Sequence, residues 1–224
     1  MTASDAASVE NPRERVLDVV DRVSELLFGL FMALTFVGAV SVADAGRDEL
    51  RTMFGAALGC NLAWGLVDAV MYVVRTITAR GRSLTLVRQV RAAPVAADGR
   101  KLIQDSLTPA VSTIVSEPAL EEMRARMMAL PRIPERPELH ANDLLAALAI
   151  FLIVVASTFP VVLPFALLQD VGTAKALSRA IALAMLFAGG LALGRYAGYG
   201  SWKVGVIMAG LGVVLVAAIM ALGG

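Results

Sequence analysis

Residues 26–43 read Leu26-Leu-Phe-Gly-Leu-Phe-Met32-Ala-Leu-Thr-Phe-Val-Gly-Ala-Val-Ser-Val-Ala43 and contain no charged side chain. As a helix this segment rises roughly 27 Å, about the thickness of the hydrocarbon core of a bilayer. Asp21 and Glu25 precede it, one helical turn apart on one face, where their like charges repel. Two interpretations are open. The two acids end the span in the headgroup zone, or they form an entrance for a cation.

The composition indicates an integral membrane protein, embedded in the lipid bilayer. Hydrophobic residues make up 58% of the 224 and charged residues only 17%, against about 25% in a typical soluble domain. The mean hydropathy is +0.72. The expected fold is all-α, a polytopic membrane protein with five transmembrane helices at residues 26–43, 53–74, 144–168, 177–194 and 204–222. A disordered tail with an amphipathic helix is expected at 1–25, and a small helical cytoplasmic insertion at 75–143.

The distribution of Lys and Arg predicts the orientation. Sixteen of the twenty lie on the side of the membrane that holds the N-terminus, and four lie on the other side. Positive charge stays on the cytoplasmic side, so the N-terminus is expected inside and the C-terminus outside. The default location is a bacterial cell (inner) membrane. The net charge of +1 gives no indication of nucleic-acid binding.

The second expected span, 53–74, is unusually polar. Asn61, Trp64 or Gly65, and Asp68 recur at the spacing of one helix face. An acid near the middle of a span costs about 2.5–3.5 kcal/mol and must face a partner or water. Asp68 is therefore either part of a functional site, or hydrogen-bonded to another helix, or nearer the cytoplasmic end of the span.

The insertion, 75–143, opens with five arginines and then continues as helix near 99–115, where Pro109 can split it. Ser116 is a candidate N-cap for a following helix that carries acids and methionines on shared faces. Carboxylates beside thioethers can bind a divalent transition metal. The same acids also suit the positive helix N-terminus, and methionines usually pack, so this alternative stays open.

The last three spans carry packing and bending signals. Pro160 and Pro164 free backbone carbonyls in the third span, which suits a transport path or a structural kink. The last two spans are expected to pack closely through their glycines: Gly189, Gly190, Gly194, Gly205, Gly210 and Gly212. The single cysteine, Cys60, is interpreted as a small residue at a helix contact. No phosphate loop, nucleophile constellation or Cys/His cluster is present, so no enzymatic activity is expected.

Short stretches in the spans resemble one known family. They are Glu25-Leu-Leu-Phe-Gly29, the segment from Gly65 to Tyr72, Pro160-Val-Val-Leu-Pro164-Phe165, Gly194-Arg195 and Ser201-Trp202-Lys203. Together with five spans, an inside N-terminus and an insertion after the second span, they make the chain similar to a divergent vacuolar iron transporter. The likeness covers nearly the whole hydrophobic part of the chain.

The resemblance implies a homodimer that moves Fe²⁺, and often Mn²⁺, out of the cytosol, usually driven by a proton gradient. The metal is then the substrate, and no cofactor is expected. By position, Asp21 and Glu25 match the acids at the cytoplasmic end of the family's first helix, and Asp68 lies next to its second-helix Met. The residues that match its cytoplasmic metal-binding helix are Glu117, Glu121, Glu122, Met123, Met127 and Met128.

One departure from the family lies in the first helix. The family has an Asp-Gly pair seven residues after the second acid, where this chain has Met32 and Ala33. The Met32 thioether with Asp68 can replace the lost carboxylate, because both groups ligate Fe²⁺ or Mn²⁺. Two functions are therefore expected as alternatives: a proton-coupled exporter of divalent metal, or a non-transporting membrane scaffold or metal sensor on the same fold.

Overall fold

The computed structural model describes residues 19–42, 47–198 and 200–223, which form helices and no strand. The helices are α1 (Val19–Val42), α2 (Arg47–Ala92), α3 (Ala96–Ser106), α4 (Pro109–Ile114), α5 (Glu117–Ala129), α6 (Ala141–Leu167), α7 (Val171–Ala197) and α8 (Ser201–Gly223). Within these residues, five helices are long and apolar enough to cross a membrane: α1, α2, α6, α7 and α8. The prediction of an all-α polytopic membrane protein is confirmed. The expectations for residues 1–18 lie outside the described residues.

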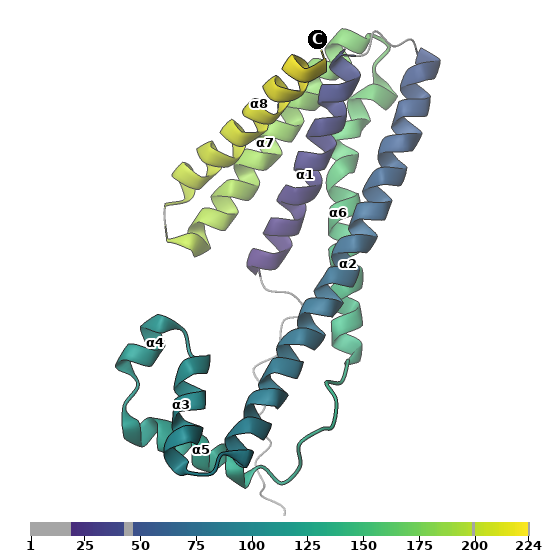
Figure 1. Cartoon of the computed structure of the whole chain (residues 1–224). Coiled ribbons are helices and arrows are strands. Elements are labelled where there is room, and N and C mark those ends of the chain that lie inside the picture. Colours follow the sequence, from purple (N-terminus) through teal and green to yellow (C-terminus); the bar gives the residue numbers. More distant parts are fainter. Residues whose placement is uncertain (1–18, 43–46, 199, 224) are drawn as a thin grey trace, which may run out of the picture. The chain divides into compact units, whose positions relative to one another are not determined.

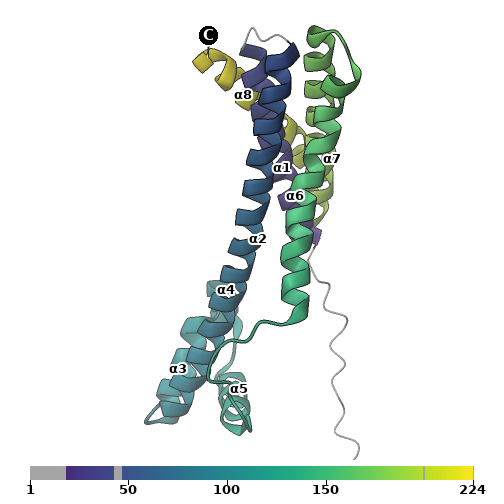
Figure 2. The ribbon, with the colours of Figure 1, turned by 90° about the vertical axis from the view of Figure 1, so that its right-hand side faces the viewer.

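The second helix is much longer than its apolar part. The predicted span ended at Val74, but α2 is one helix from Arg47 to Ala92 (Figures 1 and 2). Hydropathy falls at Arg75, yet residues 75–92 contain no proline, and the single glycine there costs only about 1 kcal/mol relative to alanine. The helix ends just before Pro94, which restricts the preceding backbone. The helix therefore continues past Arg75, where the sequence changes from apolar to charged.

The chain divides into two compact units. The membrane unit comprises the described residues up to Val70 and from Leu144 onward, and the insertion unit comprises Met71–Asp143. In the membrane unit the chain reverses direction at each span, so that the start of α1 and the end of α8 lie at opposite ends of the unit (Figure 1). In a bilayer crossed by these five helices, the start of α1 and the end of α8 would lie on opposite sides.

The core of the membrane unit is centred on α1. Buried residues recur along α1 at spacings of three and four: Leu27, Leu30, Ala33, Leu34 and Val37. They pack against Val161 of α6 and against Ala182 and Leu186 of α7. The hydroxyl of Ser178 on α7, which is fully buried, donates to the backbone carbonyl of Val161. The uncharged first segment thus forms the centre of the bundle.

Two glycines let α6 approach its neighbours. A Cβ at Gly29 of α1 would lie 2.8 Å from the carbonyl oxygen of Val154, and a Cβ at Gly65 of α2 would lie 3.2 Å from the ring of Phe151. Real Cβ atoms essentially never come within 3.0 Å of a heavy atom. Small residues at these points permit close helix packing, which compensates for the absence of a hydrophobic driving force in lipid.

The expected close packing of α7 and α8 is found at most of their glycines. A Cβ at Gly190 would lie 2.7 Å from the Cα of Gly205, and one at Gly194 would lie 2.7 Å from the Cα of Ser201. Gly210 differs from the expectation, because a Cβ there meets nothing within 4 Å in the described chain. Gly210 therefore makes no close helix contact with the described part of the chain.

The insertion unit has a small core of its own. Val90 of α2, Ile103 of α3 and Leu120 of α5 are buried together. Pro109 splits the expected 99–115 helix as its residue type suggested, and becomes the first residue of α4. Ser116 occupies the N-cap position of α5, but its side chain makes no capping hydrogen bond.

Candidate functional site

The acids of the first helix lie in its first two turns. Asp21 is exposed and Glu25 is partly buried, and both lie before the uncharged segment of α1. Their spacing of four residues places them on one face, as predicted. Met32 lies two turns further along α1 and is also partly buried.

The polar stripe of α2 faces the other helices of the membrane unit. Asn61 is only 3% exposed, Gly65 is buried and Asp68 is partly buried. Trp64, the alternative to Gly65, is 45% exposed and packs edge-on against Phe28 of α1. The inward stripe is therefore Asn61, Gly65 and Asp68, because Gly65 is buried close to Phe151 of α6 and Trp64 is nearly half exposed. Asp68 lies seven residues from Asn61, roughly 10 Å along the helix.

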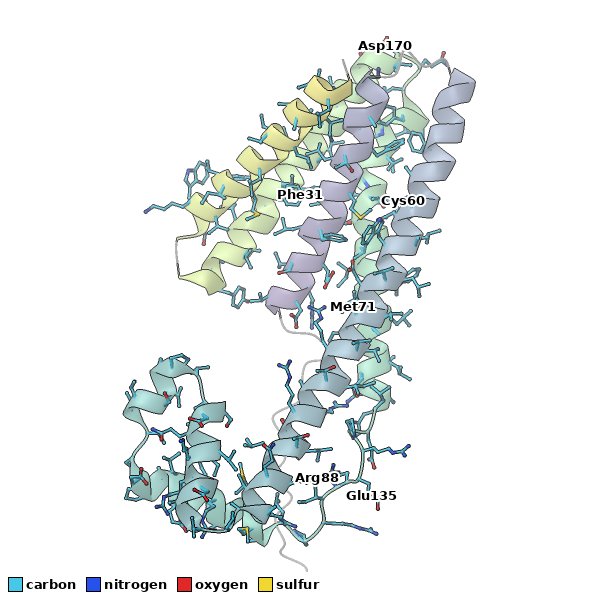
Figure 3. The ribbon with its side chains drawn as sticks, in the orientation of Figure 1. Phe31, Cys60, Met71, Arg88, Glu135 and Asp170 are labelled. Atoms are coloured by element: carbon cyan, nitrogen blue, oxygen red, sulfur yellow. The ribbon has the colours of Figure 1, made fainter. Side chains whose placement is uncertain are left out.

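A cavity of about 610 Å³ lies between α1, α2 and α6. Its wall is mostly apolar, with Phe36, Phe54 and Phe159 among its residues. Polar or sulfur-bearing side chains in the wall come from all three helices: Met32, Thr35, Cys60, Asn61 and Thr158. Figure 3 marks Cys60 on α2 and Phe31 on α1. Cys60, interpreted from the sequence as a helix-contact residue, is exposed and lines this cavity.

Asn61 is the centre of the polar contacts in this cavity. Its Nδ2 donates to the hydroxyl oxygen of Thr158 at 2.6 Å and lies 3.4 Å from the carbonyl oxygen of Val154. Both partners belong to α6, so one amide ties α2 to α6 inside the apolar bundle. The sequence indicated Asn61 as polar, but nothing in it indicated Thr158 as the partner.

In the insertion unit, the predicted metal-binding acids contact arginines. Arg100 of α3 reaches Glu117 and Glu121 of α5, each at 3.0 Å. Arg124 contacts Glu121 at 2.6 Å, and Arg126 contacts Glu122 at 2.5 Å. A metal ion would compete with the guanidinium groups for these carboxylates, most of all at Glu121, where both oxygens accept from arginines. The sequence contained Arg100 and Arg124 as possible partners for these acids, but it did not show that the fold brings them close together.

The methionines of the same helix do not share one environment. Met127 packs against the core of Val90, Ile103 and Leu120, whereas Met123 is 40% exposed. Met128 is also exposed. Among the described residues, no three His, Cys, Asp or Glu side chains come together as a group that could hold a metal ion. The metal-binding roles of the acids and methionines therefore stay predictions.

Glu121 should make the insertion unit sensitive to acid. The hydrogen bonds from Arg124 and Arg100 lower the pKa of Glu121 from 4.5 to about 2. Because the folded-state pKa is depressed, the contribution of these contacts is complete above pH 4.5 and is lost as the pH falls toward 2. We expect the amide protection of α3 and α5 to decrease over this range, measured by hydrogen exchange relative to unstructured peptides at each pH. Glu121→Gln should reduce that decrease, and an unchanged pH profile in the variant would contradict the assignment.

A row of three arginines along α2, Arg80, Arg88 and Arg91, makes hydrogen bonds that the sequence did not predict. Arg91 donates to the carbonyls of Met127, Met128 and Leu130 at the end of α5. Arg88 donates to the carbonyls of Pro134 and Glu135, at 2.9 and 2.6 Å. Figure 3 labels Arg88 and Glu135, which lie near each other. Arg91 thus satisfies carbonyls at the C-terminal end of α5, and Arg88 satisfies carbonyls of the proline-rich segment that follows, which forms no helix.

The row continues to the start of α6. Arg80 donates to the carbonyl of Glu138 at 2.7 Å and to both carboxylate oxygens of Asp143, at 2.5 and 2.8 Å. The backbone N–H of His140 also donates to Asp143. Residues expected only as a positive cytoplasmic flank thus hold the segment that leads from α5 to α6.

Comparison with known proteins adds no family assignment. No protein-family model matches the chain, and no curated protein matches it.

Proposed function

We propose that the chain is a secondary transporter that exports a divalent transition metal, Fe²⁺ or Mn²⁺, from the cytosol of a bacterial cell, in exchange for protons. The observation that carries the proposal is Asp68 on the inward stripe of α2, within a bundle of five apolar helices. An ionisable residue inside a span is costly and is commonly part of an ion or proton path.

The chemistry of Asp68 gives a reason for coupling to protons. A carboxylate in an apolar bundle is stabilised when a cation or a proton neutralises it. If metal and proton occupy Asp68 in turn, departure of one favours arrival of the other. Glu25 near the start of α1 is suited to attract the cation, and the Met32 thioether is a soft ligand that Fe²⁺ accepts.

The resemblance to the vacuolar iron transporter family supports the same substrate and predicts a homodimer. Because this chain has Met32 and Ala33 where the family has its Asp-Gly pair, α1 carries no acid between Glu25 and residue 42. In this proposal Asp68 neutralises the charge of the metal ion in place of the first-helix acid. In this proposal the acids of α5 bind metal in competition with Arg100, Arg124 and Arg126.

Metal flux into proteoliposomes of the pure protein tests the proposal. Fe²⁺ and Mn²⁺ uptake would be measured with and without a pH gradient for the wild type, Asp68→Asn and Glu25→Gln. Asp98→Asn, which changes an acid of α3 outside the spans, is the matched control. We expect Asp68→Asn and Glu25→Gln to reduce flux to the level of empty liposomes while Asp98→Asn transports normally. Normal flux in both of the first two variants would contradict this mechanism.

The alternative is a non-transporting membrane scaffold or metal sensor. This alternative is favoured by the ion pairs that arginines form with Glu117, Glu121 and Glu122. Folded wild-type protein that moves neither metal under any gradient would support this function and exclude the transporter.

A further inference from the structure

Arg179 carries a permanent charge inside an apolar span, and no acid in the described part of the chain pairs with it. It is the ninth residue of α7, in a segment from Val171 to Tyr196 that is long and apolar enough to cross a membrane. Its Nη2 donates to the sulfur of Met220 on α8 at 3.6 Å. A thioether is only a weak acceptor, and a guanidinium stays charged in proteins. A charge inside a span is costly unless it finds a partner, so Arg179 requires an anion.

Part of the Arg179 guanidinium is accessible to such a partner. Its Nε is buried and has no hydrogen-bond partner, so no ligand can reach that nitrogen. Its Nη1 also makes no hydrogen bond with the described residues, but it is not buried. The same is true of the Nζ of Lys175, a partly exposed residue that precedes Arg179 by one helical turn on the same face of α7.

The register of α7 and α8 brings the two cations to one level. Gly190 of α7 lies against Gly205 of α8, and in two antiparallel helices this register sets Met220 opposite Lys175. The contact of Arg179 with Met220 therefore shows that the arginine side chain extends toward the start of α7, as side chains on a helix generally do. The start of α7 and the end of α8 lie at the same end of the membrane unit (Figure 1).

The acid at this end of α7 is already used. Asp170 occupies the N-cap position of α7, and its carboxylate accepts hydrogen bonds from the backbone N–H and the hydroxyl of Thr173. It forms no ion pair with either cation. Two accessible cations thus lie at one level near the end of a span, where long basic side chains reach the phosphates of lipid headgroups.

We propose that Lys175 and Arg179 bind the phosphate of an anionic phospholipid in the leaflet at the start of α7. A guanidinium matches the oxygens of a phosphate with directed N–H donors, and the lysine ammonium adds a mobile point charge. The contact with Met220 holds the guanidinium toward the headgroups. A zwitterionic lipid binds less tightly, because the two cations repel the positive group that it carries beyond the phosphate.

Native mass spectrometry of the full-length protein in detergent tests the proposal. The protein is titrated with phosphatidylglycerol and with phosphatidylcholine of the same acyl chains. We expect the wild type to bind phosphatidylglycerol more tightly. Arg179→Gln and Lys175→Gln should each weaken phosphatidylglycerol binding about fivefold, which corresponds to about 1 kcal/mol for one cation near a membrane surface. Lys203→Gln is the matched control and should bind like the wild type, because Lys203 lies in the first turn of α8, at the opposite end of the helix pair.

Three results would overturn the proposal. The first is equal binding of the two lipids by the wild type, which decides the question even if the variants do not fold. The second is an unchanged preference for phosphatidylglycerol in both Arg179→Gln and Lys175→Gln, or an equal loss in Lys203→Gln. The third is displacement of the lipid by soluble glycerophosphate, which would show a site for a free anion in place of a membrane lipid.

Discussion

Gly190→Ala is expected to destabilise the membrane unit by about 1–3 kcal/mol, although it adds one methyl group. That methyl would lie 2.7 Å from the Cα of Gly205 and 2.8 Å from the carbonyl oxygen of Val204. Both atoms belong to the backbone of α8, so no side-chain rotation can relieve the contact. The two helices must move apart, and the interactions at their contact weaken.

Gly210→Ala is the matched control, since it makes the same change in the same helix pair. Its methyl meets nothing within 4 Å in the described chain. Alanine is favoured over glycine in a helix interior by about 0.5–1 kcal/mol, so this variant should be neutral or slightly stabilised. The two substitutions are therefore expected to differ in sign.

Trp202 provides the measurement. Its ring packs edge-on against Phe187 of α7, with centroids 4.9 Å apart, and so reports on the contact between α7 and α8. In a Trp64→Phe background it is the one remaining tryptophan in the sequence. Thermal unfolding followed by its fluorescence should show a lower midpoint for Gly190→Ala than for Gly210→Ala. Equal midpoints would contradict the close approach of the two helices.

Leu120→Ala should have the largest effect on the insertion unit. Leu120 is 1% exposed and forms the core of this unit with Val90 and Ile103. Truncating a buried leucine costs about 2–5 kcal/mol, from lost burial and from the cavity that remains. A core this small has few neighbours that can move in to fill the space.

Hydrogen exchange of the full-length protein measures this effect at α3 and α5. We expect the protection factors of their amides to fall by about thirtyfold or more, the equivalent of about 2 kcal/mol. Ile114→Ala is the control, because Ile114 is 81% exposed and its truncation removes little buried surface. Similar losses of protection in both variants would show that α5 is not held by the core that contains Leu120.

The sequence predicted only part of α2 correctly. Hydropathy predicted the apolar part of this helix but not its continuation to Ala92, because hydropathy reports the solvent around a segment and not its backbone conformation. The spacing of polar residues predicted one stripe but left Trp64 and Gly65 as alternatives. The structure decided for Gly65, because Gly65 is buried near Phe151 of α6 and Trp64 is 45% exposed.

The sequence by itself determined that this is an all-α membrane protein with five spans, since long uncharged segments are stable as helices in a bilayer. It also indicated Asp68 and Asn61 as polar residues inside a span. Only the tertiary structure decided which groups meet: Arg100 with Glu117 and Glu121, Arg80 with Asp143, and Asn61 with Thr158. The members of each pair lie 17 to 97 residues apart in the chain. A local pattern defines a face of a helix, but only packing determines what that face contacts.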